Sequence, residues 1–209
     1  MTKVKICGIT NLEDAAMSVR FGADEIGFNF FEKSARYIDP LKVREIFKSL
    51  VDPIVSVGVF VNESVDYVTT VSRKAGIDLI QLHGDETPEF ARVIRKLTAL
   101  PVIKAFRVSD RLQLDSMSRY QVEAFLLDSY SHEEYGGTGE KFDWNIAKQT
   151  LKHFPKIYLA GGLNPDNIGE AVKMVRPYAV DACSGLESSK GIKDLEKVEE
   201  FIRSVREAL

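Results

Sequence analysis

Eight short apolar segments alternate with longer helical patterns along this 209-residue chain, and no other property of the sequence restricts the fold as strongly. Short runs rich in β-branched and aromatic residues are typical of strands, and a helix-like stretch follows each of them. Regular alternation of the two indicates repeated β-α units and a parallel sheet. The expected strands are Val4–Cys7, Glu25–Phe30, Val55–Val61, Leu79–His83, Val102–Phe106, Ala124–Asp128, Ile157–Ala160 and Ala179–Cys183.

Eight such units fit either an open, doubly wound sheet or a closed barrel. Small or polar residues end several strands or come directly after them, among them Cys7, Asp128 and Gly161. In an open sheet the ends of the first and last strands would lie several strand spacings of about 4.8 Å apart, whereas a barrel gathers all of them on one rim. The Gly-x-Gly-x-x-Gly fingerprint of dinucleotide binding is missing after the first strand. We therefore predict one α/β domain, residues 1–209, folded as a (β/α)8 TIM barrel with its active site on the C-terminal rim.

Short polar residues mark the expected starts of several helices, because their side chains can accept a hydrogen bond from an unpaired backbone N–H and a following proline has no N–H to lose. Three such pairs are Asp39-Pro40, Thr87-Pro88 and Asn164-Pro165. Thr10 with Glu13 is interpreted as a capping box for the first helix. Asp143 is the expected cap of a helix whose Trp144 packs against the core.

Strand parity places two charged residues inside the predicted barrel. Alternate side chains of a strand point to opposite faces, so Lys5 shares a face with Cys7, and Asp181 shares one with Cys183. The first and last strands are neighbours in a closed barrel. We therefore predict that Lys5 and Asp181 form an ion pair, each offsetting the burial cost of the other. A register shifted by one residue would put them on opposite faces instead.

Composition and charge argue against nucleic acid and membrane as binding partners. Apolar residues make up 44% of the chain and charged residues 28%, which suits a globular protein with a buried core. The net charge is −3, and no stretch concentrates basic residues as a nucleic-acid groove requires. The longest apolar run, residues 54–61, is far shorter than the roughly 20 residues of a membrane helix. Without a signal-peptide pattern, we expect a cytoplasmic protein that binds neither nucleic acid nor membrane.

Two cysteines, Cys7 and Cys183, are too few for a secreted disulfide framework and lack the spacing of a structural zinc site. We expect free thiols and no bound metal. Barrel closure would bring the two residues together, so an oxidant could join them in a reversible disulfide. Two reduced and unrelated thiols are the alternative.

Several short strings go beyond generic barrel features. They are Lys5-Ile6-Cys7-Gly8-Ile9-Thr10, Gln81-Leu82-His83-Gly84, Leu127-Asp128, Gly136-Gly137-Thr138-Gly139, Phe142-Asp143-Trp144, Gly161-Gly162-Leu163-Asn164-Pro165 and Asp181-Ala182-Cys183-Ser184-Gly185-Leu186-Glu187. Together, and in this order over essentially the whole chain, they closely resemble the phosphoribosylanthranilate isomerase family of tryptophan biosynthesis. The combination is highly specific, although each string alone is not.

The resemblance implies a cofactor-independent Amadori rearrangement. In that family, N-(5-phosphoribosyl)anthranilate becomes 1-(2-carboxyphenylamino)-1-deoxyribulose 5-phosphate, with a general base that matches Cys7 and a general acid that matches Asp128. Ordinary acidities oppose these roles, since a free Asp costs roughly 4 kcal/mol to protonate at neutral pH and a free thiol roughly 2 kcal/mol to ionise. Burial would favour the neutral acid, and the nearby start of the first helix would favour the thiolate.

Substrate binding is expected on the rim as well. Gly161 and Gly162, before a capped helix, and Ser184 and Gly185, after the last strand, would present backbone amides to the phosphate. The alternative is a pair of tight turns. The family usually has Ser-Ser-Gly where this chain has Cys183-Ser184-Gly185, so a hydroxyl contact from position 183 is not expected.

Three further features complete the expected site. By resemblance, Arg36 would hold the anthranilate carboxylate, a geometry that suits a guanidinium; a solvated surface arginine is the alternative. His83, on the same strand face as Gln81, either lines the pocket or satisfies a turn. The long glycine-containing loop after Asp128 is a candidate lid, because loops beyond about 12 residues often cover sites.

Two other functions stay open at this point. One is the aminoaldose isomerase of the histidine pathway, which shares the chemistry and the barrel but typically uses two aspartates. The other is a non-catalytic phosphosugar-binding barrel, which would tolerate Cys7→Ser and Asp128→Asn. The small phosphorylated substrate is the only partner expected besides a second copy of the chain, since the sequence fits a monomer or a homodimer.

Overall fold

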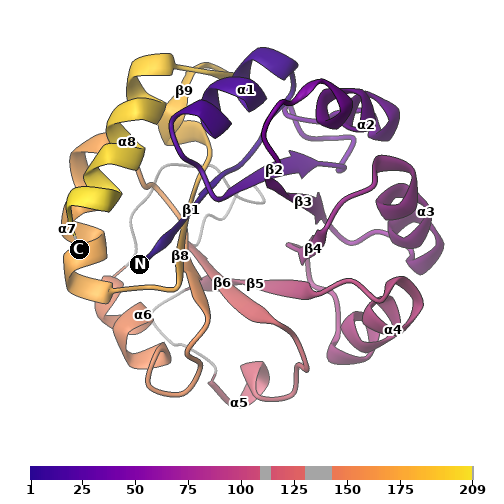
Figure 1. Cartoon of the computed structure of the whole chain (residues 1–209). Helices are drawn as coiled ribbons and strands as arrows, with labels where there is room; N and C mark the ends of the chain where they lie inside the picture. The colour runs from indigo at the N-terminus through magenta and orange to yellow at the C-terminus, as the bar shows by residue number, and fades with distance from the viewer. Residues whose placement is uncertain (109–113, 130–142, 209) are drawn as a thin grey trace.

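The computed structural model describes residues 1–108, 114–129 and 143–208, and in these residues eight parallel strands close into a barrel. Neighbouring strands pair in chain order, and β1 pairs with β8, which confirms the predicted (β/α)8 barrel over the open sheet. The helices form an outer ring around the strands (Figure 1). The strands are β1 Lys3–Ile6, β2 Glu25–Asn29, β3 Val55–Phe60, β4 Leu79–Leu82, β5 Val102–Val108, β6 Ala124–Ser129, β7 Ile157–Leu159 and β8 Ala179–Ala182.

Polar caps predicted the starts of five helices, and four of these caps are confirmed. The helices are α1 Leu12–Arg20, α2 Pro40–Ser49, α3 Val65–Ala75, α4 Pro88–Thr98, α5 Leu114–Met117, α6 Trp144–Thr150, α7 Pro165–Val175 and α8 Leu195–Glu207. Asp39, Thr87, Asp143 and Asn164 each accept a hydrogen bond from a first-turn backbone N–H of α2, α4, α6 and α7, respectively. Trp144 packs against the core, as predicted.

The predicted capping role of Thr10 is wrong. Asn11 is the cap of α1, because it has extended backbone and its side chain accepts from the N–H of Asp14. The Thr10 hydroxyl instead donates to the carbonyl oxygen of Gly191 at 2.6 Å. Thr10 therefore ties the loop after β1 to a later part of the chain.

The barrel has two apolar layers. Outward-facing strand residues such as Ile6 and Phe28 pack with helix residues such as Phe201. A smaller cluster fills the barrel itself and includes Val57 and Leu126. Each large apolar side chain in these layers stabilises the fold by roughly 1.5–3 kcal/mol relative to exposure.

Charged residues also lie inside the barrel, as parity predicts. Lys5 and Asp181 are register partners, and the Lys5 Nζ lies 2.8 Å from the Asp181 Oδ1. Glu25, the register partner of Lys5 on β2, accepts from the Tyr158 hydroxyl at 2.9 Å. These pairs fill the barrel floor beneath the rim.

Between β8 and α8 the chain forms an addition that the sequence interpretation did not include. A short 3-10 turn, Ser184–Leu186, leads into an antiparallel hairpin of β9 Glu187–Ser189 and β10 Ile192–Lys193. This hairpin borders the C-terminal rim next to β1. The glycine-containing lid candidate, residues 130–142, lies outside the described residues. None of the described helices is long and apolar enough to cross a bilayer.

Candidate active site

A cavity of about 480 Å³ opens at the C-terminal rim. All eight residues that the sequence selected as catalytic or substrate-binding line it: Cys7, Arg36, His83, Asp128, Gly161, Gly162, Ser184 and Gly185. Asn29, Gln81 and Asp181 line it too, which the sequence interpretation did not assign. Strand ends far apart in the sequence thus share one pocket, as a closed barrel requires.

Cys7 follows β1 and lies among groups that stabilise its thiolate. A hydrogen bond from the Cys183 thiol lowers the pKa of Cys7 well below its ordinary value; burial opposes this shift, and the Lys5 ammonium adds to it. Gly27 on β2 makes room for this arrangement, because a Cβ there would lie 2.7 Å from the Cys7 Sγ and 3.2 Å from the Lys5 Nζ. The neighbourhood therefore favours a nucleophilic or basic sulfur at Cys7 over an inert thiol.

The ion pair below Cys7 holds Lys5 in its charged form. Burial lowers the pKa of Lys5, but Asp181 and Cys7 outweigh it and leave the pKa above the ordinary value. Burial raises the pKa of Asp181 to about 7 although Lys5 opposes the shift. Lys5 is fully buried, so its charge acts on Cys7 with little screening by water.

Cys183 follows β8 and is the partner of Cys7. Both cysteines are free thiols, as predicted. The hydrogen bond to Cys7 raises the pKa of Cys183, which keeps the proton on Cys183. The reversible disulfide stays a prediction.

Asp128 lies on β6 in a polar chain with two residues of the β4 end. Its Oδ2 lies 3.1 Å from the His83 Nε2, and the His83 Nδ1 lies 2.8 Å from the Gln81 Nε2. Gln81 and His83 share the inward face of their strand, as parity predicts, and His83 lines the pocket. Asp128 and Cys7 thus face one cavity from β6 and from the end of β1, with β7 and β8 between them.

The loops after β7 and β8 are built to present backbone amides. Gly161 and Gly162 have φ values of 82° and 63°, a left-handed conformation that glycine adopts without strain. The carbonyl of Gly162 accepts from the Asn167 side chain at 2.9 Å, and this residue completes a capping box with Asn164 at the start of α7. The second loop, Ser184-Gly185, packs against the first at Leu163. Adjacent loops with a helix start between them can surround an anion.

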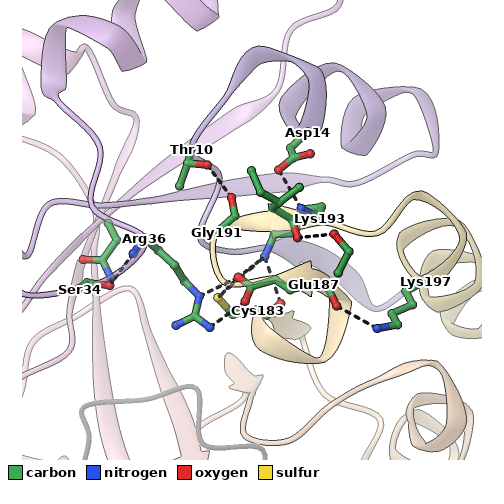
Figure 2. Close-up of polar contacts among 12 residues, drawn as sticks. Thr10, Asp14, Ser34, Arg36, Cys183, Glu187, Gly191, Lys193 and Lys197 are labelled. Carbon is green, nitrogen blue, oxygen red and sulfur yellow. Dashed lines mark hydrogen bonds and ion pairs between the residues drawn. The ribbon is translucent and has the colours of Figure 1, made fainter.

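Arg36 lies at the cavity edge but is not a solvated surface residue. Its Nε and Nη2 donate to the two carboxylate oxygens of Glu187 on β9, at 2.7 and 2.8 Å (Figure 2). The Lys193 Nζ lies 3.3 Å from Glu187 Oε1 and also donates to the Cys183 carbonyl at 3.1 Å. Arg36 and Lys193 oppose the burial of Glu187 and hold the pKa of its carboxyl below the ordinary value.

Glu187 therefore joins the loop after β2 to the hairpin after β8, across the end of β1. The Nε and Nη2 edge of the Arg36 guanidinium is engaged in this pair, and the Nη1 group is not part of it. Glu187 is part of a string that resembles the family, but the string by itself gives this residue no role. Arg36 and Glu187 are 151 residues apart in the sequence, so their ion pair becomes visible only in the folded structure.

Comparison with known proteins agrees with this geometry. A family model described as N-(5'phosphoribosyl)anthranilate (PRA) isomerase matches residues 4–204. A curated relative from Trichlorobacter lovleyi, named N-(5'-phosphoribosyl)anthranilate isomerase, is 49% identical over 209 residues and covers 100% of each chain.

Solved structures show the same similarity. The phosphoribosyl anthranilate isomerase of Thermus thermophilus superposes with a TM-score of 0.91 at 35% identity, over 100% of both chains. A phosphoribosyl anthranilate isomerase in complex with reduced 1-(o-carboxyphenylamino)-1-deoxyribulose 5-phosphate has a TM-score of 0.85 at 39% identity, over 99% of this chain and 100% of that one. With the family model spanning nearly every strand and helix, the chain belongs to the phosphoribosylanthranilate isomerase family.

Proposed function

We propose that residues 1–209 form a single barrel domain that isomerises N-(5-phosphoribosyl)anthranilate to 1-(2-carboxyphenylamino)-1-deoxyribulose 5-phosphate in tryptophan biosynthesis, without a cofactor. The observation that carries the proposal is the shared cavity, in which a thiol with a lowered pKa faces a carboxyl group beside two glycine-containing loops. Ligand-bound relatives of the same fold support the substrate class.

Asp128 is the general acid of the proposed reaction. It gives a proton to the furanose ring oxygen while the bond from that oxygen to C1 breaks, and the nitrogen lone pair forms the C1=N bond of a Schiff base. The ring oxygen keeps the proton as a hydroxyl, and Asp128 becomes a carboxylate. A positioned acid of this kind contributes about 10²- to 10⁴-fold.

Cys7 is the general base. Its thiolate takes the proton from C2, the C2–H electrons form a C1=C2 bond, and the C1=N electrons return to nitrogen, which gives an enolamine. The hydroxyl proton at C2 is lost and C1 gains a proton, so the product is the ketone. The Cys183 hydrogen bond and the Lys5 charge keep the sulfur ionised before this step.

The two ends of the substrate fit the two sides of the cavity. Backbone amides at Gly161, Gly162, Ser184 and Gly185 would bind the phosphate, which is an anion of the kind that loop and helix starts attract. The anthranilate carboxylate would approach Arg36, whose orientation Glu187 fixes. We further propose a cytoplasmic enzyme that acts as a monomer or a homodimer.

The test uses freshly generated phosphoribosylanthranilate and the variants Cys7→Ser and Asp128→Asn. Each should lose about 10²- to 10⁴-fold in turnover while still binding the reduced product analogue in calorimetry. Asp52→Asn, which removes an exposed carboxylate between α2 and β3, is the matched control and should behave as the unmodified protein.

The same assay separates the alternatives. Turnover of the histidine-pathway aminoaldose in place of phosphoribosylanthranilate would favour the sister isomerase. Unchanged activity in both variants, or ligand binding without any turnover by the unmodified protein, would refute the proposed function.

A further inference from the structure

Gln81 is a buried polar residue of the cavity to which the proposed reaction gives no role. Its side chain is 1% exposed, and its Oε1 has no hydrogen-bond partner among the described residues. Buried amide oxygens are nearly always paired, because an unpaired one costs about 1–3 kcal/mol. In the part of the chain that the structure describes, two other buried polar atoms are unpaired, on Ser72 and Trp144, and neither residue lines the cavity. The unpaired amide thus coincides with the candidate site.

The present orientation of the amide determines where the His83 proton lies. An amide nitrogen only donates, so the Gln81 Nε2, 2.8 Å from His83 Nδ1, makes that ring nitrogen an acceptor. A neutral imidazole then carries its proton on Nε2. This proton points to the Asp128 Oδ2 at 3.1 Å, which accepts it as a carboxylate oxygen.

Reversal of the amide would produce the opposite tautomer. The Gln81 Oε1 would accept from a protonated His83 Nδ1, and a neutral ring would then have a bare Nε2 with no proton to donate to Asp128. Both orientations leave one amide atom of Gln81 without a partner among the described residues. Reversal therefore exchanges one burial cost on Gln81 for a similar one, but it also removes the hydrogen bond from the His83 Nε2 to the Asp128 Oδ2.

We propose that Gln81 is a positioning residue that selects the Nε2-protonated tautomer of His83, whose N–H then orients the Asp128 carboxyl group in the cavity. The inference rests on the proposed isomerase function.

The other charged groups of the cavity do not replace this control. Asp181 on β8 faces Asp128 and carries the same charge sign, while Lys5 on β1 is paired with Asp181. Cys7, at the end of β1, interacts with Lys5 and Cys183. Among the described residues, Gln81 is the one recorded partner of the His83 Nδ1.

The tautomer can be read directly by ¹⁵N NMR of the histidine side chains in the full chain. The sequence has three histidines, and a His83→Asn variant assigns the signal of His83. The unmodified protein without ligand should show His83 protonated at Nε2 and bare at Nδ1. Gln81→Glu, whose carboxylate can only accept, should move the proton to Nδ1. Gln81→Met should abolish the preference.

Kinetics of the same variants test the effect on catalysis. Gln81→Met should lower kcat by about 10- to 100-fold, at or below the lower end of what a positioned general acid contributes, with KM within about twofold. Ser72→Ala removes another unpaired buried hydroxyl, on α3, and is the matched control with unchanged kcat. If Gln81→Met does not fold, Gln81→Asn, which withdraws the amide by one methylene, should give the same loss.

The outcomes separate the two proposals. An unchanged His83 tautomer in Gln81→Glu and Gln81→Met, or a kcat equal to that of Ser72→Ala, overturns the role of Gln81. Absence of isomerase turnover in the unmodified protein overturns the proposed function, whereas the NMR signals still report whether Gln81 selects the tautomer.

Discussion

Gly185 joins the two loops of the proposed phosphate site, and its replacement by alanine should separate them. A Cβ at this position would lie 2.2 Å from the Leu163 carbonyl oxygen and 3.1 Å from the Asn164 Cβ. Ordinary contact begins at about 3.4 Å, so the loops after β7 and β8 must part by about 1.2 Å. Both clashing groups belong to the backbone or to the cap of α7, which cannot rotate away as the end of a long side chain would.

The expected cost has two parts. Overpacking of this kind destabilises a fold by about 1–3 kcal/mol, and each kcal/mol lowers Tm by about 2–4 °C in a domain of this size. A displacement near 1 Å in a substrate-positioning loop can cost about 10²-fold. We therefore expect kcat/KM to fall by about 10- to 100-fold for Gly185→Ala, mainly through KM, because the phosphate loops lie away from the reacting carbons.

Steady-state kinetics and thermal denaturation check this prediction beside a matched glycine. Gly169, inside α7, has no heavy atom within 4 Å of its would-be Cβ. Gly169→Ala should raise Tm, since alanine is better than glycine in a helix by roughly 0.5–1 kcal/mol, and should leave KM unchanged. A Gly185→Ala protein with the KM and Tm of the unmodified chain would refute the close packing of the two loops.

Two further predictions concern the Lys5–Asp181 pair and the Cys7 thiol above it. Lys5→Met should destabilise the fold by about 3–5 kcal/mol in urea denaturation, because it leaves Asp181 buried without its partner. Replacing both residues by apolar ones should recover most of the lost stability. A double variant as unstable as Lys5→Met would contradict the reasoning. Iodoacetamide should modify Cys7 at a rate nearly independent of pH between 7 and 9. The Cys183 hydrogen bond lowers the pKa of Cys7, burial opposes this shift and Lys5 adds to it, so the thiolate is lost only at lower pH. In Cys183→Ala the rate at pH 7 should fall, and a rate in the unmodified protein that climbs tenfold per unit up to about 8.5, as for a free thiol, would count against a stabilised thiolate.

The repeating pattern of the sequence determined the architecture. Strand and helix periods are local properties, and eight repeats with polar residues at the strand ends left few ways to bury the apolar faces. Parity alone also paired Lys5 with Asp181 across 176 residues, because the alternation of side chains in a strand is strict. Four helix starts followed from single capping residues, because a cap bonds to backbone N–H groups of its own first turn. The miss at Thr10 arose because Asn11, one position later, competes for the same role.

The candidate site likewise has residues that the sequence pattern indicates and residues that only the structure shows. Its glycines, Cys7 and Asp128 could be selected from the sequence because they are residues of unusual type at or directly after strand ends. The side chains that interact with them could not be selected in this way. Glu187 is an ordinary polar residue in the sequence, and its role depends on Arg36, which the closed barrel brings within 3 Å of it. Strand parity placed Gln81 on the same face as His83, but the unpaired Oε1 of Gln81 is visible only in the structure.

The sequence by itself thus determined the barrel, its inward and outward faces and the residues on its rim, since all of these follow from periods of two and 3.6 residues. Only the tertiary structure decided the state of those residues. The thiolate of Cys7 and the orientation of Arg36 depend on Cys183 and Glu187, which lie far away in the sequence, because electrostatic and hydrogen-bond energies depend on distances through space and not on separation along the chain.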